Sequence, residues 1–132
     1  MKRFLFVLIL CALQSAVAQQ TAIYHDAEKG FVLGTELFEK AKYAAAQKQF
    51  DAIVKSEAVS EEARSNSAYY AALCASELQN ADAEERLLKF LEKYPVCSHY
   101  NDGVFATGLF YYRQKKWKKV IEWFSKTDAQ VQ

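Results

Sequence analysis

Residues 33–50, LGTELFEKAKYAAAQKQF, contain a pattern of small and apolar residues that returns twice further along the chain. Residues 70–87 (YAALCASELQNADAEERL) and 107–124 (TGLFYYRQKKWKKVIEWF) repeat it, each beginning 37 residues after the one before. Four columns share this spacing: Gly34, Ala71 and Gly108; Leu37, Cys74 and Tyr111; Ala46, Ala83 and Val120; Phe50, Leu87 and Phe124. A weaker fifth column holds Tyr43, Asn80 and Trp117. Columns in one register indicate an internal structural repeat.

The composition favours helices as the building blocks of these repeats. The 132 residues include one proline and four glycines, and 52% of them are hydrophobic. Few turn-forming residues argue against a β fold, and the abundant Ala, Lys, Glu, Leu and Gln are good helix formers. We therefore predict an all-α fold with six helices, at about residues 26–41, 43–56, 60–78, 81–93, 100–114 and 117–127. They pair into three hairpins, at residues 27–58, 59–95 and 96–128.

The columns resemble the tetratricopeptide repeat family, whose units carry Leu-Gly-x-x-Tyr, then Ala-x-x-x-Phe, then proline. The first repeat has Leu33-Gly34-x-x-Leu37 and Ala46-x-x-x-Phe50, and the second ends at Pro95. Lys93-Tyr94-Pro95-x-x-Ser98 is similar to segments of exported repeat proteins of the Tol–Pal and outer-membrane-assembly type. The period of 37 departs from the family's 34 residues, and Ala58 and Ala71 replace the usual proline and glycine. The resemblance implies stacked antiparallel hairpins in a right-handed superhelix.

The same resemblance implies a concave groove lined by the first helix of each hairpin, where such arrays bind their partners. The positions beside the core columns are the groove candidates: Phe31, Thr35 and Phe38 in repeat one, Tyr69 and Ala72 in repeat two, and Leu109, Tyr112 and Arg113 in repeat three. Aromatic residues and arginine are frequent anchors of protein interfaces. The alternative is that the aromatic residues pack between hairpins, because aromatics at helical spacing are commonly core.

The first 18 residues have the three parts of a secretory signal peptide. Lys2 and Arg3 precede an apolar run that extends to Leu13, and a small-x-small ending closes at Ala18. The run is too short to cross a membrane, which needs roughly 20 apolar residues. Cys11 follows a leucine inside the run, unlike the cysteine of a lipoprotein signal. We expect cleavage after Ala18, a linker at 19–26, and export to the bacterial periplasm or outer-membrane surface.

The remaining chemical motifs do not indicate catalysis. Cys97 and His99 lack the further ligands of a zinc site and the positioned base of a nucleophile, so we expect no metal, cofactor or catalytic residues. Whether Cys74 and Cys97 form a disulfide stays open. Without Lys2 and Arg3 the chain has 15 basic and 16 acidic residues, which gives no electrostatic case for nucleic acid. The basic stretch at residues 113–119 is interpreted as a solvated turn or a site for an acidic partner.

The last predicted helix carries an apolar stripe of Val120, Ile121, Trp123 and Phe124, and the six residues 127–132 are too few to cover it. The chain therefore self-associates through Trp123 and Phe124, binds a partner there, or forms the N-terminal part of a longer array. Two functions follow from these observations. One is a non-catalytic module that binds a protein or peptide in its groove, and the other is an assembly scaffold that acts through its terminal helix.

Expression in a bacterium with a C-terminal tag tests the export prediction. The mature protein should begin at Gln19, because the small residues Ala16 and Ala18 flank the position at which signal peptidases cut. Intact-mass spectrometry of the protein released from the periplasm measures the new N-terminus. A protein that keeps residues 1–18 would contradict the prediction.

Overall fold

The computed structural model describes residues 25–128, so the predicted signal segment and most of the linker lie outside the described part of the chain. The described residues form six helices and no strand, which confirms the all-α prediction. The first helix covers residues 25–39 of this range. It is followed by α2 (Tyr43–Lys55), α3 (Glu61–Glu77), α4 (Ala83–Lys93), α5 (Tyr100–Arg113) and α6 (Trp117–Asp128). The ends of α2 to α6 agree with the predicted ends to within two residues.

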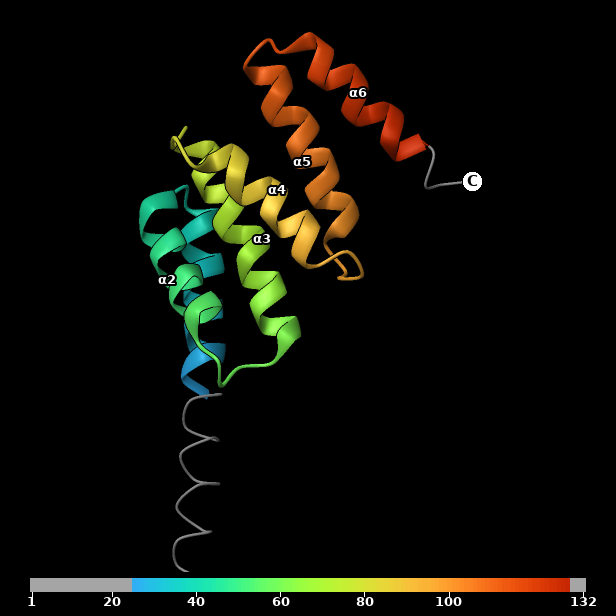
Figure 1. The fold of residues 1–132 in the computed structure, drawn as a ribbon. Helices are drawn as coiled ribbons and strands as arrows, with labels where there is room; N and C mark the ends of the chain where they lie inside the picture. The colour runs from blue at the N-terminus through green and yellow to red at the C-terminus, as the bar shows by residue number, and fades with distance from the viewer. Residues whose placement is uncertain (1–24, 129–132) are drawn as a thin grey trace, which may run out of the picture.

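Each helix from α2 to α5 packs against the next helix in the chain, and the first helix packs against α2 where Gly34 meets Phe50. Figure 1 shows the first helix and α2 at one end of the molecule and the hairpin of α5 and α6 at the other. The repeat columns of the first two units form the centre: Ala46, Phe50, Cys74, Ala83 and Leu87 have no exposed surface. Apolar residues at these positions leave water as neighbouring helices pack, and this burial is the main stabilising term of the fold.

The same turn closes all three hairpins, although the sequence places no glycine in it. Ala41, Gln79 and Lys115 adopt φ angles of 55°, 55° and 57°, in the left-handed region. The amide of Ala41 donates to the carbonyl of Phe38, and the amide of Lys42 donates to Leu37. The amides of Gln79 and Asn80 in the second hairpin, and of Lys115 and Lys116 in the third, donate in the same pattern. These are Schellman motifs, which end a helix by satisfying its last carbonyl groups.

The start of α5 has no side-chain cap. The N-cap residue is His99, and Asn101 and Asp102 lie inside the first turn of the helix. The Asp102 carboxylate lies 3.1 Å from Nδ1 of His99 and stands at the positive end of the helix dipole. By contrast, Ser60 caps α3 in the expected way, because its Oγ accepts from the amide of Ala63 at 3.1 Å.

Two of the recurring glycines let an aromatic ring of the paired helix pack directly against the helix backbone. A Cβ atom added at Gly34 would lie 2.7 Å from the Phe50 ring, and one at Gly108 would lie 2.6 Å from the Phe124 ring. Gly103 has the same relation to Phe90, at 2.5 Å, although it belongs to no repeat column. Gly34 and Gly108 therefore set the distance between the two helices of a hairpin, and Gly103 sets the distance between α4 and α5 of successive hairpins.

A pair of glycine substitutions in the first helix tests this constraint. Gly34→Ala should destabilise the protein by about 1–3 kcal/mol, because its methyl group overpacks against the fully buried Phe50. Gly30→Ala is the matched control: its methyl group would be 3.6 Å from Ile53, an ordinary contact. There the higher helix propensity of alanine should leave stability unchanged or raise it by up to about 1 kcal/mol. Urea unfolding measures both, and equal effects would contradict the prediction.

Candidate functional site

The structure gives packing roles to the aromatic groove candidates of the first repeat. The Phe31 ring makes edge-on contacts with Phe50 at 5.7 Å and with Tyr70 at 5.8 Å between ring centroids. Phe38 contacts Tyr43 at 5.3 Å and Tyr70 at 5.5 Å in the same way. Both phenylalanines are partly buried against the core around Phe50. They join the first hairpin to α3, as the alternative interpretation held.

The remaining candidates of the first two repeats are also engaged within the fold. Ala72 is 1% exposed and packs in the core beside Leu87, so its prediction as a groove residue is wrong. Tyr69 stacks on the His99 ring at 4.5 Å with an angle of 6° between the planes. Burial, with a smaller contribution from the charge of Asp102, raises the pKa of Tyr69 to about 12. Thr35 donates from Oγ1 to the carbonyl of Val32 at 2.8 Å.

The candidates of the third repeat lie on a different kind of surface. Leu109 is half-buried and Tyr112 is exposed on α5, on the same side as the exposed Phe105. Helix α6 adds exposed residues at the spacing i, i+4 and i+7. We call the combined surface the α5–α6 face, and its members are Phe105, Leu109, Tyr112, Trp117, Ile121 and Phe124. Ring contacts tie the two helices together, between Phe105 and Phe124 at 6.4 Å and between Tyr112 and Trp117 at 5.4 Å.

The α5–α6 face corresponds in register to surfaces that are covered in the first two hairpins. Phe50 and Leu87 occupy the same column as Phe124 and have no exposed surface, whereas Phe124 is 38% exposed. Phe50 is covered by Tyr70 of α3, which stacks on it at 5.2 Å, and Leu87 lies in a core cluster with Phe110 and Tyr111 of α5. No described helix follows α6 to cover Phe124.

The two tryptophans of α6 differ in exposure. Trp117 shares a repeat column with Tyr43, which packs against the core around Phe50, but Trp117 is 53% exposed. Trp123, predicted for self-association, is only partly exposed and packs against the two adjoining core clusters. Its indole Nε1 donates to the carbonyl of Val104 at 2.8 Å. The exposed face as a whole was not predicted from the sequence. The signal that points to it is the helical spacing of apolar residues at positions 105, 109 and 112 and again at 117, 121 and 124.

The basic stretch at residues 113–119 is held largely by carboxylates of the neighbouring hairpin. Lys119 and Lys116 donate to Glu84 at 2.6 and 3.1 Å, and the Tyr111 hydroxyl donates to the same carboxylate at 3.0 Å. Arg113 donates to Glu77 at 2.7 Å. The hydrogen bond from Lys119, followed by those from Lys116 and Tyr111, lowers the pKa of Glu84 to about 2 against the opposing effect of burial. The stretch therefore attaches the third hairpin to α3 and α4.

The described residues bear on whether the two cysteines are bridged and on whether a metal ion could be held. Cys74 and Cys97 are free cysteines, the first buried and the second partly buried. Burial raises the pKa of the Cys74 thiol to about 12, so this thiol stays protonated and unreactive at neutral pH. Residues 25–128 contain no group of three or more His, Cys, Asp or Glu side chains placed to hold a metal ion. No helix in that range is long and apolar enough to cross a membrane.

The Glu84 cluster makes a pH-dependent contribution to stability. A carboxyl group whose pKa is lowered from 4.5 to about 2 stabilises the fold fully above about pH 4.5, and this contribution disappears as the pH falls towards 2. Glu84→Gln should lower the free energy of unfolding by about 1–2 kcal/mol at neutral pH. The difference from the parent protein should shrink below pH 4.5 in urea titrations. The exposed Glu85→Gln variant is the control, and an acid-insensitive difference for Glu84→Gln would contradict the prediction.

Comparison with known proteins provides no family assignment for this chain. No protein-family model, no curated protein and no solved structure matches it. The inferences on function therefore rest on the repeat columns, the packing of the helices and the surfaces that the packing leaves exposed.

Proposed function

We propose that this chain is a non-catalytic binding module of the tetratricopeptide type, exported to the bacterial cell envelope, that holds a protein or peptide partner. The observation that carries the proposal is the α5–α6 face. It presents four exposed aromatic side chains and Ile121 on two neighbouring helices. Soluble proteins seldom leave a contiguous apolar patch of this kind exposed unless it binds something. Aromatic residues in such a patch are frequent anchors of binding energy.

The occupant that suits this face is an amphipathic helix of the partner. In the first two units the equivalent surface is covered by a helix, α3 over Phe50 and α5 over Leu87. A partner helix with an apolar stripe would complete the third unit in the same geometry. In this helix-in-groove mode the partner helix supplies anchors at i, i+3, i+4 and i+7. Trp117, Ile121 and Phe124 form an exposed apolar stripe along α6 against which such anchors would pack. This surface keeps two of the eight groove candidates, Leu109 and Tyr112, and its other four members were not among them.

The tetratricopeptide assignment is supported by three repeated features. The columns recur at a constant interval of 37 residues, a glycine faces a phenylalanine ring within the first and third hairpins, and the same left-handed turn closes all three. Because each unit buries its apolar face only against the next, such arrays present one uncovered face at the end of the stack. The right-handed superhelix and its concave groove are part of this proposal.

The alternative function is that of an assembly scaffold, in which the α5–α6 face stacks on a further repeat or on a second copy of the chain. The observation that favours it is the register of Phe124 with the covered residues Phe50 and Leu87. The N-terminal hairpin also exposes Val32 and Leu33 on its first helix. Leu33 stands in the same repeat position as Tyr70, which covers Phe50. A second copy could therefore add its first helix to α6 in the same way.

Capture from an envelope extract tests the proposed function. The C-terminally tagged protein should retain a reproducible partner, and Ile121→Asp should reduce that capture about tenfold or more, because it places a charge at the centre of the apolar face. Val96→Asp is the matched control, since Val96 is 97% exposed but lies in the turn between α4 and α5. Quantitative mass spectrometry provides the measurement, and circular dichroism checks that both variants remain helical.

The outcome separates the two functions. Equal capture by the parent and Ile121→Asp proteins would contradict a partner site on the α5–α6 face. Concentration-dependent self-association in sedimentation experiments, abolished by Ile121→Asp and retained by Val96→Asp, would favour the scaffold function instead.

A further inference from the structure

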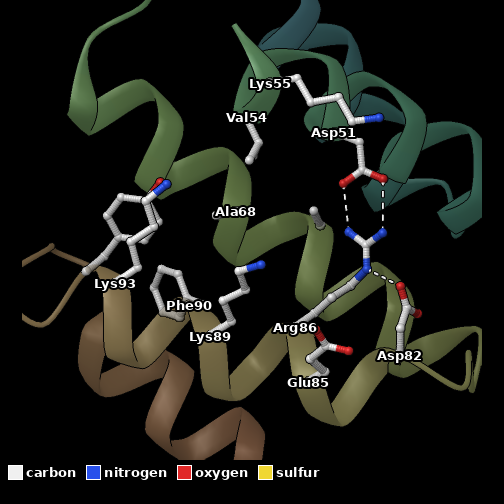
Figure 2. Close-up of a pocket in the computed structure, with 12 residues that line it drawn as sticks. Asp51, Val54, Lys55, Ala68, Asp82, Glu85, Arg86, Lys89, Phe90 and Lys93 are labelled. Atoms are coloured by element: carbon white, nitrogen blue, oxygen red, sulfur yellow. Dashed lines mark hydrogen bonds and ion pairs between the residues drawn. The ribbon is translucent and has the colours of Figure 1, made fainter. Parts of the chain in front are cut away.

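A second surface, separate from the α5–α6 face, lies between α2 and α4. It is a cleft of about 340 Å³ whose floor is formed by Ala68 and Ala71 of α3. One wall comes from α2, with Asp51, Val54 and Lys55, and the other comes from α4 and the residues flanking it. Figure 2 shows the two walls, with Asp51 and Lys55 on one side and Arg86 and Lys89 on the other. The cleft shares no residue with the α5–α6 face.

One end of the cleft is fixed by Arg86. Its guanidinium group donates to both carboxylate oxygens of Asp51, at 2.7 and 3.4 Å, and to Asp82 at 2.6 Å (Figure 2). This arrangement joins α4 to α2 across the cleft and uses the charge of the arginine internally. Two-point contact between a guanidinium group and a carboxylate restricts both side chains. The Arg86 end is therefore a rigid, charge-compensated boundary and not a free anion site.

The rest of the cleft carries lysines that form no ion pair within the described part of the chain. Lys55, Lys89 and Lys93 line it, and none of them makes an ion pair with a described residue. By comparison, Lys116 and Lys119 are both paired with Glu84 on α4. Among the lining residues, three unpaired ammonium groups therefore face a single unpaired carboxylate, that of Glu85.

Apolar surface lies directly beside these ammonium groups. Val54, Ala68 and Phe90 line the cleft, and Tyr94 forms part of its wall next to Lys93. The Lys93 ammonium nitrogen is 5.2 Å from the centroid of the Tyr94 ring. The Tyr94 hydroxyl is buried without a hydrogen-bond partner among the described residues. The cleft therefore places ammonium groups next to an apolar wall.

We propose that the cleft between α2 and α4 binds a peptide carboxylate that is flanked by an apolar side chain. The carboxylate lies among Lys55, Lys89 and Lys93, and the apolar side chain packs on Val54, Ala68 and Phe90. The inference goes beyond the proposed function, because it adds a second contact surface on other helices. A partner with an acidic segment next to its amphipathic helix would be held at both surfaces, and two linked contacts strengthen binding without either being strong alone.

The charge of the lining favours a carboxylate over a phosphate group. The cleft is lined by four basic residues, Arg86 among them, and by three acidic residues, Asp51, Asp82 and Glu85. A single negative charge therefore balances the net charge of +1 that these residues give. A phosphate dianion, or the headgroups of an anionic membrane, would bring excess negative charge against Asp51, Asp82 and Glu85. The charge of the lining therefore fits a peptide segment that brings one carboxylate into the cleft.

A pair of short synthetic peptides tests the proposal with the full-length protein. The first is a fluorescein-labelled peptide, blocked at both ends, with glutamate between leucines, and the second has glutamine in place of glutamate. Fluorescence polarisation at low ionic strength should show binding of the glutamate peptide and about tenfold weaker binding of the glutamine peptide. A third peptide with a free C-terminus and glutamine inside distinguishes a terminal carboxylate from a side-chain carboxylate.

Variants of the protein locate the site. Lys89→Gln combined with Lys93→Gln should weaken binding of the glutamate peptide about tenfold, since each exposed charge pair contributes modestly. Lys118→Gln combined with Lys115→Gln removes the same charge from the third hairpin and should leave binding unchanged. Equal affinity for the glutamate and glutamine peptides, or an equal loss in the control variant, would overturn the proposal. So would binding to vesicles containing phosphatidylglycerol with no binding to any of the peptides.

Discussion

The close approach of paired helices at glycine is the constraint on which the rest of this structure depends. Gly34 and Gly108 leave space for the faces of the Phe50 and Phe124 rings, and any side chain larger than hydrogen would occupy that space. With the helices at this distance, Ala46, Ala83 and Leu87 of the other columns pack with no exposed surface. Apolar burial then extends from hairpin to hairpin, because each unit completes the core of the one before it. The array is consequently stabilised by neighbour contacts and has no single central core.

The third hairpin is attached mainly through different side chains from the first. Rings connect the first hairpin to α3, through Tyr70 and its contacts with Phe31, Phe38 and Phe50, and an ion pair joins Asp51 of α2 to Arg86 of α4. The third hairpin adds charged hydrogen bonds to its apolar contacts, with Glu84 of α4 accepting from both Lys116 and Lys119. Its outer face has no covering helix among the described residues. The same end of the molecule therefore combines the exposed apolar surface with attachments that salt and acid weaken.

The helix positions followed from the sequence because small and apolar residues at fixed intervals report directly on packing. The conformation of the turns did not follow from the sequence. A residue in the left-handed region is usually a glycine, and here Ala41, Gln79 and Lys115 hold that conformation. The groove candidates were predicted from repeat positions, but an aromatic residue beside a core column has the same sequence signature whether it faces solvent or a neighbouring hairpin. Only the positions of the helices show that Phe31 and Phe38 face inward while Tyr112 faces outward. Pairings such as Glu84 with Lys119 span 35 residues and have no local pattern.

The uneven attachment of the hairpins has a consequence for the motion of the chain. In an array held by neighbour contacts, the units open separately and with different free energies. The unit of α5 and α6 is packed on one side only, so its amides should exchange with solvent before those of α3 and α4. A ligand that ties this unit down would spread its protection inwards, since each hairpin is the template for the next. The molecule then behaves as a graded series of cooperative folding units, whose loosest member carries the exposed α5–α6 face.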